Sequence, residues 1–344
     1  MTKIAINGLG RIGRASLKML IQNPELELVA VNDLVPPYHL AYLLNFDTVY
    51  GKMQNRVSFD EFNLYVNGRT IRVFNEPDAE RLPWGQMGIE LVLECTGKFT
   101  RRQELEKHLR AGAQRVILSA PSKSEDVPTI VPGVNEIENP NETIVSCASC
   151  TTNAIAPVLE VLSRRIGVRK SLMTTLHAYT ASQSLVDEPG KDMRAGRAAA
   201  LNFIPTTTGA SAATTKVLPQ LQNRVNGLAI RGPVPTGSIA DITILTERPT
   251  SVEEINNIFS QEAGSDRYVG ILGVNVEPIV SSDIIMDPRA SVVDLAMTQV
   301  VDGDLVKILA WYDNEWGYAN QLIKAAERMA RIKRSQQQNE MAAI

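Results

Sequence analysis

The sequence predicts an α/β protein: a doubly wound parallel sheet comes first, and an α+β region with a mixed or antiparallel sheet follows. Three observations lead to this prediction. Short apolar strand patterns alternate with helical patterns through the first third of the chain. A glycine-rich turn joins the first strand to the first helix. After residue 225 the strand patterns follow one another with fewer helices between them, as in an antiparallel or mixed sheet.

The bulk composition is that of an ordinary globular protein with room for two domains. The chain has 344 residues, 44% hydrophobic residues and a formal charge of −3. No basic stripe favours nucleic acid as a partner, no apolar stretch reaches membrane-spanning length, and the N-terminus lacks a signal-peptide pattern. An odd set of three cysteines argues against a disulfide framework and favours a reducing compartment, so we expect a cytoplasmic protein.

The first strand, helix and intervening turn predict a dinucleotide site. Residues 4–7 form a short apolar strand, and Gly8, Gly10 and Gly13 follow as Gly-x-Gly-x-x-Gly before helical spacing over 14–21. The first glycine allows the tight turn, the second lets backbone approach a pyrophosphate, and the third lets the helix pack against the strand. The motif in this context favours a Rossmann-type parallel sheet.

An acidic residue then stands where such folds bind the ribose of the cofactor. The strand over 26–31 delivers Asp33, about 20 residues past the glycines, where a carboxylate accepts hydrogen bonds from ribose hydroxyls. A solvated loop acid is the alternative reading. No Arg or Lys stands at 34–37 to neutralise a 2′-phosphate, so we expect NAD rather than NADP.

Further strands over 91–95 and 116–119 flank a helix over 101–113 and extend the parallel sheet. Thr96, Gly97 and Ser119 then occupy carboxyl ends of strands, the edge at which doubly wound sheets bind ligands.

Cys150 is the candidate nucleophile, and His177 is its candidate acid/base partner. A cysteine enzyme needs a group that keeps the thiol ionised and moves a proton. Of the three histidines, His108 sits within a charged helical stretch and His39 follows Pro36-Pro37 in an expected loop, whereas His177 ends a strand over 172–176. A buried thiol and a core histidine are the alternatives. Zinc at Cys147 and Cys150 would need further ligands nearby, which the sequence lacks, so we expect no metal site.

A helix over 151–166 places Cys150 at a helix N-terminus, which should lower the pKa of the thiol and offer amides to an oxyanion.

Residues 186–197 are predicted to form a long loop. The Thr-rich turn over 205–210 precedes a helix over 211–218 and suits either a phosphate or helix capping. Arg231 directly follows an apolar strand run over 227–230, and its permanent charge needs an anion or an acid. The remaining strands are expected over 239–245, 290–295 and 305–312, with helices over 252–263 and 317–334.

At this point five motifs together resemble phosphorylating glyceraldehyde-3-phosphate dehydrogenases, and the resemblance runs from end to end. They are Asn7-Gly8-Leu9-Gly10-Arg11-Ile12-Gly13-Arg14, Ala148-Ser149-Cys150-Thr151-Thr152-Asn153, His177-Ala178-Tyr179-Thr180, Pro205-Thr206-Thr207-Thr208-Gly209 and Trp311-Tyr312-Asp313-Asn314-Glu315-Trp316-Gly317-Tyr318.

The resemblance implies a function in glycolysis or gluconeogenesis and a division of the chain. Residues 1–149 would bind NAD, completed by the helix over 315–334; 150–314 would be catalytic, and 335–344 a frayed tail. The Cys150 thiolate would attack the aldehyde to give a thiohemiacetal. Hydride transfer to NAD would leave a thioester, which inorganic phosphate cleaves to 1,3-bisphosphoglycerate. The family is also tetrameric, which implies a homotetramer.

By the same resemblance, individual residues receive roles. Thr180 and Arg231 would hold the phosphate of glyceraldehyde 3-phosphate. The attacking phosphate would be held by Ser149, Thr151, Thr208 and Gly209. The cofactor would be contacted by Arg11, Ile12, Asp33, Ser119, Asn314 and Tyr318.

Some positions depart from the family pattern. Ser182 replaces an Asp or Asn, Ala195 replaces an arginine of the loop, and Pro77 stands where an arginine usually lies near adenine. These departures leave the chemistry intact and bear on substrate preference and affinity. Erythrose-4-phosphate dehydrogenase and a regulatory or scaffolding paralogue are the alternative functions. The first group usually departs from His-Ala-Tyr-Thr and Pro-Thr-Thr-Thr-Gly, both of which this chain keeps.

Overall fold

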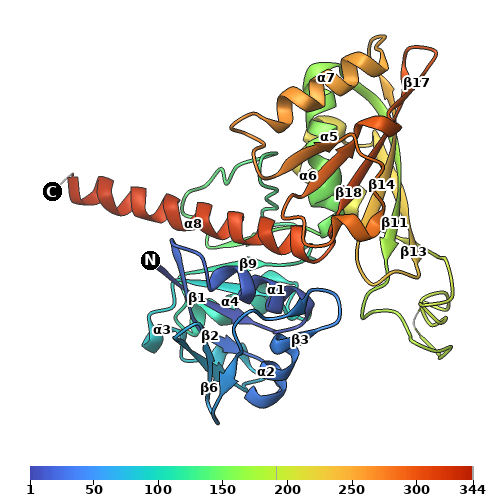
Figure 1. Cartoon of the computed structure of the whole chain (residues 1–344). Helices are drawn as coiled ribbons and strands as arrows, with labels where there is room; N and C mark the ends of the chain where they lie inside the picture. Colours follow the sequence, from blue (N-terminus) through green and yellow to red (C-terminus); the bar gives the residue numbers. More distant parts are fainter. Residues whose placement is uncertain (191, 343–344) are drawn as a thin grey trace. The chain divides into compact units, whose positions relative to one another are not determined.

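The computed structural model describes residues 1–190 and 192–342, with side chains described through residue 332, and it forms two compact units (Figure 1). The first unit comprises Met1–Ile130, Glu136–Ala148 and Leu322–Ile344, and the second comprises Val131–Asn135 and Ser149–Gln321. The chain therefore passes from the first unit to the second directly before the predicted nucleophile.

The first unit is built on an eight-stranded sheet with the order β10-β9-β8-β1-β2-β7-β6-β5. Six strands are parallel, from β10 to β7, and their order on either side of β1 is that of a doubly wound fold. The predicted fold class is confirmed here. The strands are β1 (Thr2–Asn7), β2 (Leu26–Asn32), β5 (Ser58–Phe59), β6 (Asn63–Val66), β7 (Arg69–Phe74), β8 (Leu91–Glu94), β9 (Arg115–Leu118) and β10 (Ile144–Ser146), and β3 (Phe46–Asp47) pairs with β4 (Gly51–Lys52) outside the sheet.

The central strands of this sheet are apolar because both faces are covered. Every residue of β8 and β9 is buried, as expected for a parallel sheet between helical layers. The helices of the unit are α1 (Arg11–Leu20), α2 (Pro37–Asn45), α3 (Trp84–Met87), α4 (Arg102–Arg110) and the part of α8 (Trp316–Ala342) that begins at Leu322.

The prediction that His39 lies in a loop is wrong. His39 lies in the first turn of α2, which starts at Pro37 with Pro36 as its extended N-cap residue. Proline is tolerated in the first helical turn because its missing N–H would have no partner there, and its fixed φ suits the helix. The Pro-Pro pair therefore starts a helix instead of excluding one.

The second unit contains a mixed sheet with the order β12-β13-β11-β14-β18-β16-β15, as the sequence predicts. Only the pairs β11–β13 and β15–β16 are parallel. The strands are β11 (Val168–Ala178), β12 (Ile204–Thr207), β13 (Val225–Gly232), β14 (Ser238–Thr246), β15 (Leu272–Asn275), β16 (Ser291–Asp294) and β18 (Leu305–Tyr312), with β17 (Gln299–Val301) paired to β18.

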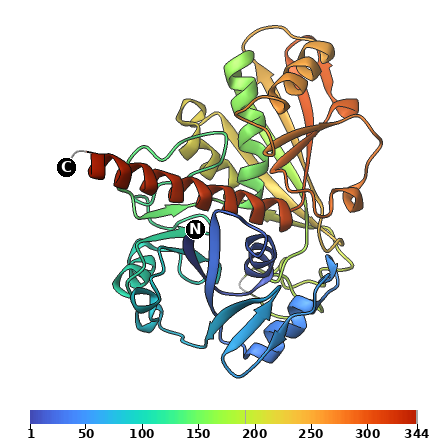
Figure 2. The same cartoon turned by 60° about the vertical axis from the view of Figure 1, so that its left-hand side comes forward.

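One face of this sheet is covered by the helices α5 (Cys150–Arg165), α6 (Ala210–Val217) and α7 (Val252–Ala263) (Figures 1 and 2). Burial alternates along β11, so Met173, Thr175 and His177 face the helices. Leu172 and Leu176 face the other way and are 66% and 45% exposed, and Leu228 on β13 is 43% exposed. The outer face of the sheet thus presents leucines to solvent.

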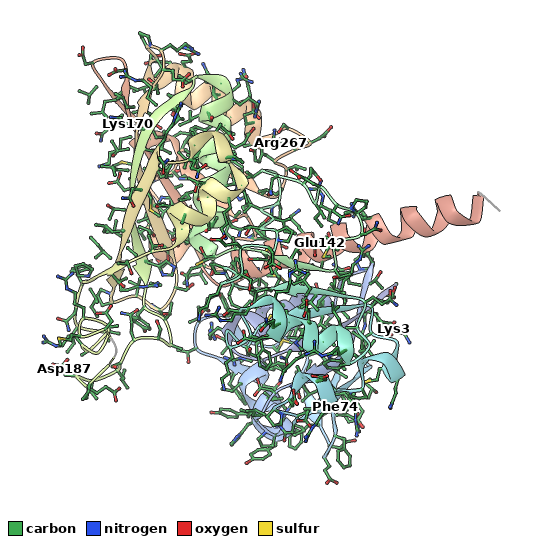
Figure 3. The ribbon with its side chains drawn as sticks, turned by 180° about the vertical axis from the view of Figure 1, so that it is seen from behind. Lys3, Phe74, Glu142, Lys170, Asp187 and Arg267 are labelled. Atoms are coloured by element: carbon green, nitrogen blue, oxygen red, sulfur yellow. The ribbon has the colours of Figure 1, made fainter. Side chains whose placement is uncertain are left out.

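Two segments differ from the sequence-based expectations. The Thr-rich turn begins as β12, an edge strand in which Pro205 is acceptable because one side of the strand has no partner. The last helix continues to Ala342, past the expected end at 334, and the last two residues of the expected frayed tail lie outside the described part. The described residues of the predicted long loop, 186–190 and 192–197, contain no helix or strand, and Asp187 lies on this loop (Figure 3). Asp187 pairs with Arg197 at 2.9 Å.

Candidate active site

Cys150 is the first residue of α5, as predicted. Ser149 is the N-cap residue of the helix, and its hydroxyl oxygen accepts a hydrogen bond from the Thr152 N–H at 3.1 Å. Ala148, directly before it, has a left-handed φ of 56°. The half-buried thiol therefore sits where unpaired backbone N–H groups and the positive end of the helix dipole are found.

His177 lies beside the thiol. It is the tenth residue of an eleven-residue strand whose alternation points it toward α5, and it is 4% exposed. Its Nε2 atom lies 3.3 Å from the Cys150 Sγ atom, which is hydrogen-bonding distance for sulfur. The predicted pairing of thiol and imidazole is therefore present in the structure, across 27 residues of chain.

Arg231 completes a three-residue cluster. Parallel pairing of β11 with β13 places Arg231 opposite His177 in register. The Arg231 Nη1 atom lies 2.5 Å from His177 Nδ1 and 3.3 Å from the carbonyl oxygen of Ala178. Within the described residues no carboxylate forms an ion pair with Arg231, so its charge faces the site uncompensated.

The electrostatics of this cluster differ in one respect from the expectation. Burial raises the pKa of the Cys150 thiol, and the Arg231 charge and hydrogen bonds at Thr151 oppose this rise without overcoming it. The predicted lowering of the thiol pKa by the helix is therefore not reached in the ligand-free protein. Burial, followed by repulsion from Arg231, lowers the pKa of His177 to about 3. The ligand-free cluster thus holds a neutral imidazole.

Tyr312 is a site residue that the sequence argument missed. Its hydroxyl bonds to the hydroxyls of Thr151 at 3.0 Å and Thr175 at 2.7 Å, and its ring meets the His177 ring edge-on at 5.9 Å. A tyrosine at a buried position of an apolar strand needs a partner for its hydroxyl, and that signal was present in the sequence. The Tyr312 hydroxyl therefore links the first turn of α5 to β11 through hydrogen bonds.

The predicted phosphate-binding residues fall into separate groups. Ser149 and Thr151 flank Cys150. The Thr180 hydroxyl bonds to that of Ser182 at 2.9 Å, just past β11. Thr208 and Gly209 lie at the start of α6, where Gly209 is an N-cap residue without a side-chain cap. Among the described residues no hydrogen bond joins Thr208 or Gly209 to Cys150 or His177. The structure therefore brings together Cys150, His177, Arg231 and Thr151 most directly.

In the first unit, a cavity of about 410 Å³ lies at the carboxyl ends of the strands. It is lined by Asn7, Gly8, Gly10, Asn32, Asp33, Leu34, Glu76, Pro77, Cys95, Thr96, Lys98 and Phe99. These residues follow β1, β2, β7 and β8, including the point where the strand order reverses between β1 and β8. That reversal is where doubly wound folds bind ligands.

The three glycines of the turn meet different demands. A Cβ on Gly13 would lie 2.0 Å from the carbonyl oxygen of Gly8, and one on Gly8 would lie 2.8 Å from the Thr96 nitrogen. Gly10 instead faces open space, with nothing within 4 Å of an added Cβ, and it precedes α1 without a side-chain cap. The amides of α1 are therefore available to a pyrophosphate, and the residues present fit a dinucleotide.

Asp33 holds the turn as well as facing the cavity. One carboxylate oxygen accepts from the Leu9 N–H at 2.6 Å and the other from the Val35 N–H at 3.0 Å. The reading of Asp33 as a freely solvated loop acid is therefore wrong. Arg11 pairs with Asp47 at 2.7 Å, an interaction that sequence reasoning did not anticipate because Asp47 lies on the separate β3–β4 pair.

A buried polar network lies at the carboxyl ends of β1 and β8. Glu94, fully buried at the end of β8, accepts from Asn7 at 2.6 Å and from the Thr96 N–H at 2.8 Å. His108 also contacts it at 3.0 Å, and Trp84 donates to the other His108 nitrogen at 3.1 Å. Since the Trp84 N–H can only donate, His108 must carry its hydrogen on the nitrogen facing Glu94. His108 is thus a core residue in spite of its charged helix.

The remaining predicted cofactor residues lie in both units. Ile12 and Gly13 are in α1, and Gly97 and Ser119 follow β8 and β9. Asn314 and Tyr318 belong to the second unit. The amide oxygen of Asn314 accepts from Ser238 at 2.9 Å, so its NH₂ group is left to serve as a donor.

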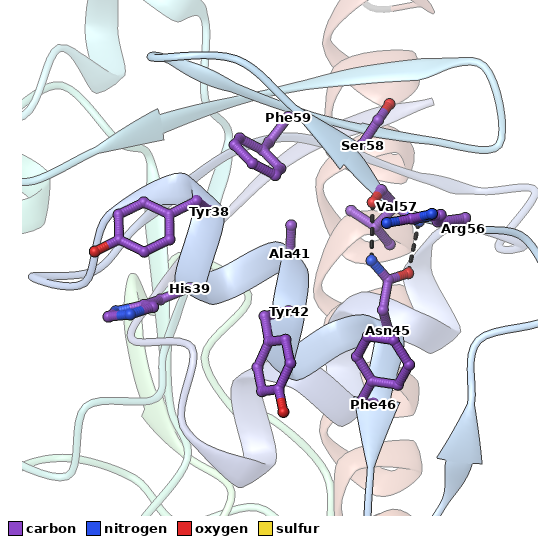
Figure 4. Close-up of a pocket in the computed structure, with 10 residues that line it drawn as sticks. All are labelled: Tyr38, His39, Ala41, Tyr42, Asn45, Phe46, Arg56, Val57, Ser58 and Phe59. Carbon is purple, nitrogen blue, oxygen red and sulfur yellow. Dashed lines mark hydrogen bonds between the residues drawn. The ribbon is translucent and has the colours of Figure 1, made fainter.

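A second cavity in the first unit, of about 620 Å³, includes none of the predicted site residues (Figure 4). Tyr38, Tyr42 and Phe59 surround it, and the Asn45 amide bonds to both backbone groups of Val57 at its end. In the described part of the chain, no group of three or more potential metal ligands occurs. Among the same residues, none of the helices is long and apolar enough to span a bilayer.

Comparison with known proteins gives matches over both units. Residues 2–102 match the NAD binding domain of glyceraldehyde 3-phosphate dehydrogenase, and residues 149–314 match the C-terminal domain of the same enzyme.

Relatives that match this chain over nearly their whole length are also named glyceraldehyde-3-phosphate dehydrogenase. The glyceraldehyde-3-phosphate dehydrogenase of Streptomyces coelicolor is 47% identical over 324 residues, covering 93% of this chain and 96% of the relative. That of Thermotoga maritima is 47% identical over 335 residues, covering 96% and 100%. Glyceraldehyde-3-phosphate dehydrogenase 1 of Bacillus subtilis is 46% identical over 331 residues, covering 96% and 98%.

Proposed function

The chain belongs to the glyceraldehyde-3-phosphate dehydrogenase family, and on that premise we propose that it catalyses the NAD-dependent, phosphorylating oxidation of glyceraldehyde 3-phosphate to 1,3-bisphosphoglycerate. The observation that carries the proposal is the contact of 3.3 Å between Cys150 Sγ and His177 Nε2. It supplies a nucleophile and an acid/base group in one place. The first unit would be the NAD-binding domain and the second the catalytic domain.

Cys150 and His177 have the roles of nucleophile and proton carrier. The Cys150 sulfur attacks the aldehyde carbon, and the oxygen becomes the hydroxyl of a thiohemiacetal. His177 at Nε2 takes the proton of that hydroxyl as the carbon gives up its hydride, leaving a thioester on the sulfur. Inorganic phosphate then attacks the thioester carbon, and the Cys150 thiolate departs. Backbone N–H groups at the start of α5 would stabilise the negative oxygen that forms in both steps.

NAD, when bound, accepts the hydride. The cavity beside Gly8, Gly10 and Asp33 would hold its adenosine and pyrophosphate. Arg11 and Ile12 at the start of α1, and Thr96, Gly97 and Ser119 after β8 and β9, would also contact the cofactor. Asn314 would donate its NH₂ group to the carboxamide, with Tyr318 close to the ring. The Asp33 carboxylate favours NAD over NADP because it would repel a 2′-phosphate.

The two phosphate groups would be bound by separate sets of residues. Thr180 and Arg231 would hold the phosphate of the substrate, and the uncompensated charge of Arg231 supports this role. Ser149, Thr151, Thr208 and Gly209 would hold the attacking phosphate. In support, the N-cap residue of α6, Gly209, provides no side-chain cap, and among the described residues the buried Ser211 hydroxyl in the first turn has no hydrogen-bond partner. Ala195 leaves this region with one cation fewer than the family pattern.

A steady-state assay with glyceraldehyde 3-phosphate, NAD and inorganic phosphate tests the proposal. Wild-type protein should form NADH and acyl phosphate, and Cys150→Ser should abolish NADH formation while NAD still binds. A matched control is Cys147→Ser, which changes a buried thiol outside the cluster. Higher kcat/KM for erythrose 4-phosphate would refute the substrate assignment. Absent turnover with both aldehydes would favour the scaffolding alternative.

We also propose a homotetramer in the cytoplasm. The exposed leucines of the outer sheet face, Leu172, Leu176 and Leu228, support self-association, and three free cysteines suit a reducing compartment. Light scattering coupled to size exclusion should give a mass of four chains for the wild type and a smaller mass for Leu172→Glu. Lys170→Glu, at an exposed position of the same strand, is the control. A monomeric wild type would refute the assembly.

A further inference from the structure

A hydrogen-bond network centred on Glu94 links the interior of the first unit to the cavity at its strand ends. We call it the Glu94 network, and it contains the side chains of Trp84, His108, Glu94, Thr96, Asn7 and Asn32. At the interior end, the Trp84 N–H donates to Nδ1 of His108 at 3.1 Å. The ring therefore carries its hydrogen on Nε2, which donates to Glu94 at 3.0 Å. Trp84, His108 and Glu94 are all fully buried, so the indole sets the direction of the hydrogen bonds at this end.

The cavity end of the network has a fixed direction as well. The amide oxygen of Asn32 accepts from the Glu76 N–H at 2.9 Å, and its NH₂ group donates to the Glu76 carbonyl at 2.9 Å. Backbone groups cannot exchange these roles, so the Asn32 amide has one orientation. Its NH₂ group also donates to the amide oxygen of Asn7 at 2.8 Å. The NH₂ group of Asn7 must then face Glu94, to which it donates at 2.6 Å.

The Glu94 carboxylate joins the two ends. One of its oxygens accepts from Asn7 and His108, and the other accepts from the N–H and the hydroxyl of Thr96. Since four donors meet the two oxygens, the carboxyl group carries no hydrogen of its own. Among the described residues no lysine or arginine pairs with it, so these donors stabilise its buried charge. Loss of one donor should therefore displace the others.

The groups that Glu94 orders form part of the cavity wall. Asn7, Asn32, Glu76 and Thr96 all line the cavity. The first glycine of the turn packs against the same backbone, because a Cβ on Gly8 would lie 2.8 Å from the Thr96 nitrogen. A shift of Asn7 or Thr96 would therefore change the surface that a dinucleotide contacts.

We propose that Glu94 and His108 are positioning residues for NAD: neither lines the cavity, and together they hold its wall in the binding arrangement when no cofactor is bound. The proposal rests on the function assigned above, because the ligand is the cofactor of that reaction. A wall that is already ordered lowers the entropic cost of binding, so the Glu94 network should raise the affinity for NAD. Cys150 and His177 belong to the other unit, so the network should not change kcat.

Calorimetric titration of the full-length protein with NAD, in the absence of aldehyde, measures this affinity directly. His108→Leu removes one donor to Glu94, and we expect the Kd for NAD to rise roughly tenfold. The value of kcat at saturating NAD should stay as in the wild type. His108→Gln is the conservative variant, because its NH₂ group can donate to Glu94 and its oxygen can accept from Trp84. Most of the affinity should return in this variant.

Glu94→Gln tests the centre of the network with little change of shape. An NH₂ group replaces one carboxylate oxygen and faces donors, so the Kd for NAD should again rise. This variant carries the test if His108→Leu does not fold. Leu64→Ala is the control for lost stability, because Leu64 is fully buried on β6 and belongs to neither the network nor the cavity lining. It should lower the urea midpoint and leave the Kd unchanged.

A double-mutant cycle determines whether His108 acts through Asn7. In an Asn7→Ala background the amide that Glu94 orients is absent, so His108→Leu should raise the Kd by a smaller factor than in the wild type. Equal factors in both backgrounds would overturn the positioning role. An unchanged Kd in Glu94→Gln would do the same, as would a rise in Leu64→Ala as large as that in His108→Leu.

Turnover of glyceraldehyde 3-phosphate with NAD is measured on the same preparations. It separates the positioning role from the function on which that role rests. If the wild type is active and the variants keep its Kd, or lose kcat at an unchanged Kd, only the positioning role is refuted. A wild type that neither binds NAD nor oxidises the aldehyde refutes the proposed function.

Discussion

Removing the Tyr312 hydroxyl should weaken both the fold and the reaction. Tyr312→Phe keeps the ring against His177 but removes the bonds to Thr151 at 3.0 Å and Thr175 at 2.7 Å. Thr175 retains a second partner, the Ile239 carbonyl at 3.3 Å, whereas the one remaining partner of the Thr151 hydroxyl among the described residues is the Cys150 sulfur at 4.0 Å. Because Thr151 is 5% exposed, its hydroxyl is left nearly unsatisfied, and the free energy of unfolding should fall by about 2 kcal/mol.

Urea unfolding at fixed protein concentration measures this loss, and kcat should fall by up to about tenfold because the start of α5 is less well held. Tyr268→Phe is the matched control: Tyr268 is fully buried and donates to Glu160 at 2.5 Å, away from the thiol. It should lower stability without lowering kcat. In the Tyr312→Phe background, Thr151→Val should restore about 1 kcal/mol by removing the unsatisfied hydroxyl. Wild-type stability and turnover in Tyr312→Phe would refute this reasoning, as would an equal loss of kcat in Tyr268→Phe.

Three further predictions concern His177 and Asp33. His177→Asn should lower kcat by about 10²–10⁴ in steady-state assays, the usual effect of losing an acid/base group, and a smaller loss would contradict its role. Burial and the Arg231 charge hold the pKa of His177 at about 3 in the folded protein, below its ordinary value of 6.5, so the folded state binds fewer protons than the unfolded state between these values. The stability of the wild type should therefore fall more steeply than that of His177→Gln as pH drops through this window, measured by urea unfolding; parallel curves would count against the shift. Asp33→Gly should improve kcat/KM for NADP relative to NAD by roughly tenfold, and an unchanged ratio would discredit the assigned repulsion.

Local patterns predicted the elements that carry the chemistry. The turn at Gly8, Gly10 and Gly13 has its strand and helix, Cys150 begins a helix, and His177 lies near the end of a strand. Each of these follows from periodicity, capping or turn chemistry over a few neighbouring residues, which is information a single sequence contains. The helix predicted over 252–263 has these bounds in the structure, and its start follows from the signal Thr250-Ser251-Val252-Glu253, in which Ser251 is the N-cap residue.

Contacts between distant segments were beyond the reach of these patterns. Tyr312 and Thr151 are 161 residues apart, and Arg11 and Asp47 belong to different elements. The thiol pKa was predicted in the wrong direction because a helix N-terminus can be inferred from sequence, whereas the extent of burial around a sulfur cannot. The buried contact of His108 with Glu94 was missed for the same reason, since a charged helix gives no sign of which face is covered.

The pleat of β11 gives the two faces of one strand unrelated functions. Leu176 looks outward and His177 inward, so the surface proposed for assembly and the imidazole of the reaction are separated by a single peptide unit. Substitutions at the outer positions cannot be treated as remote from turnover, because a small rotation of the strand would swing the ring away from the sulfur. We therefore expect few substitutions to be tolerated on either face of β11. Substitutions that make the protein monomeric should also lower its turnover rate.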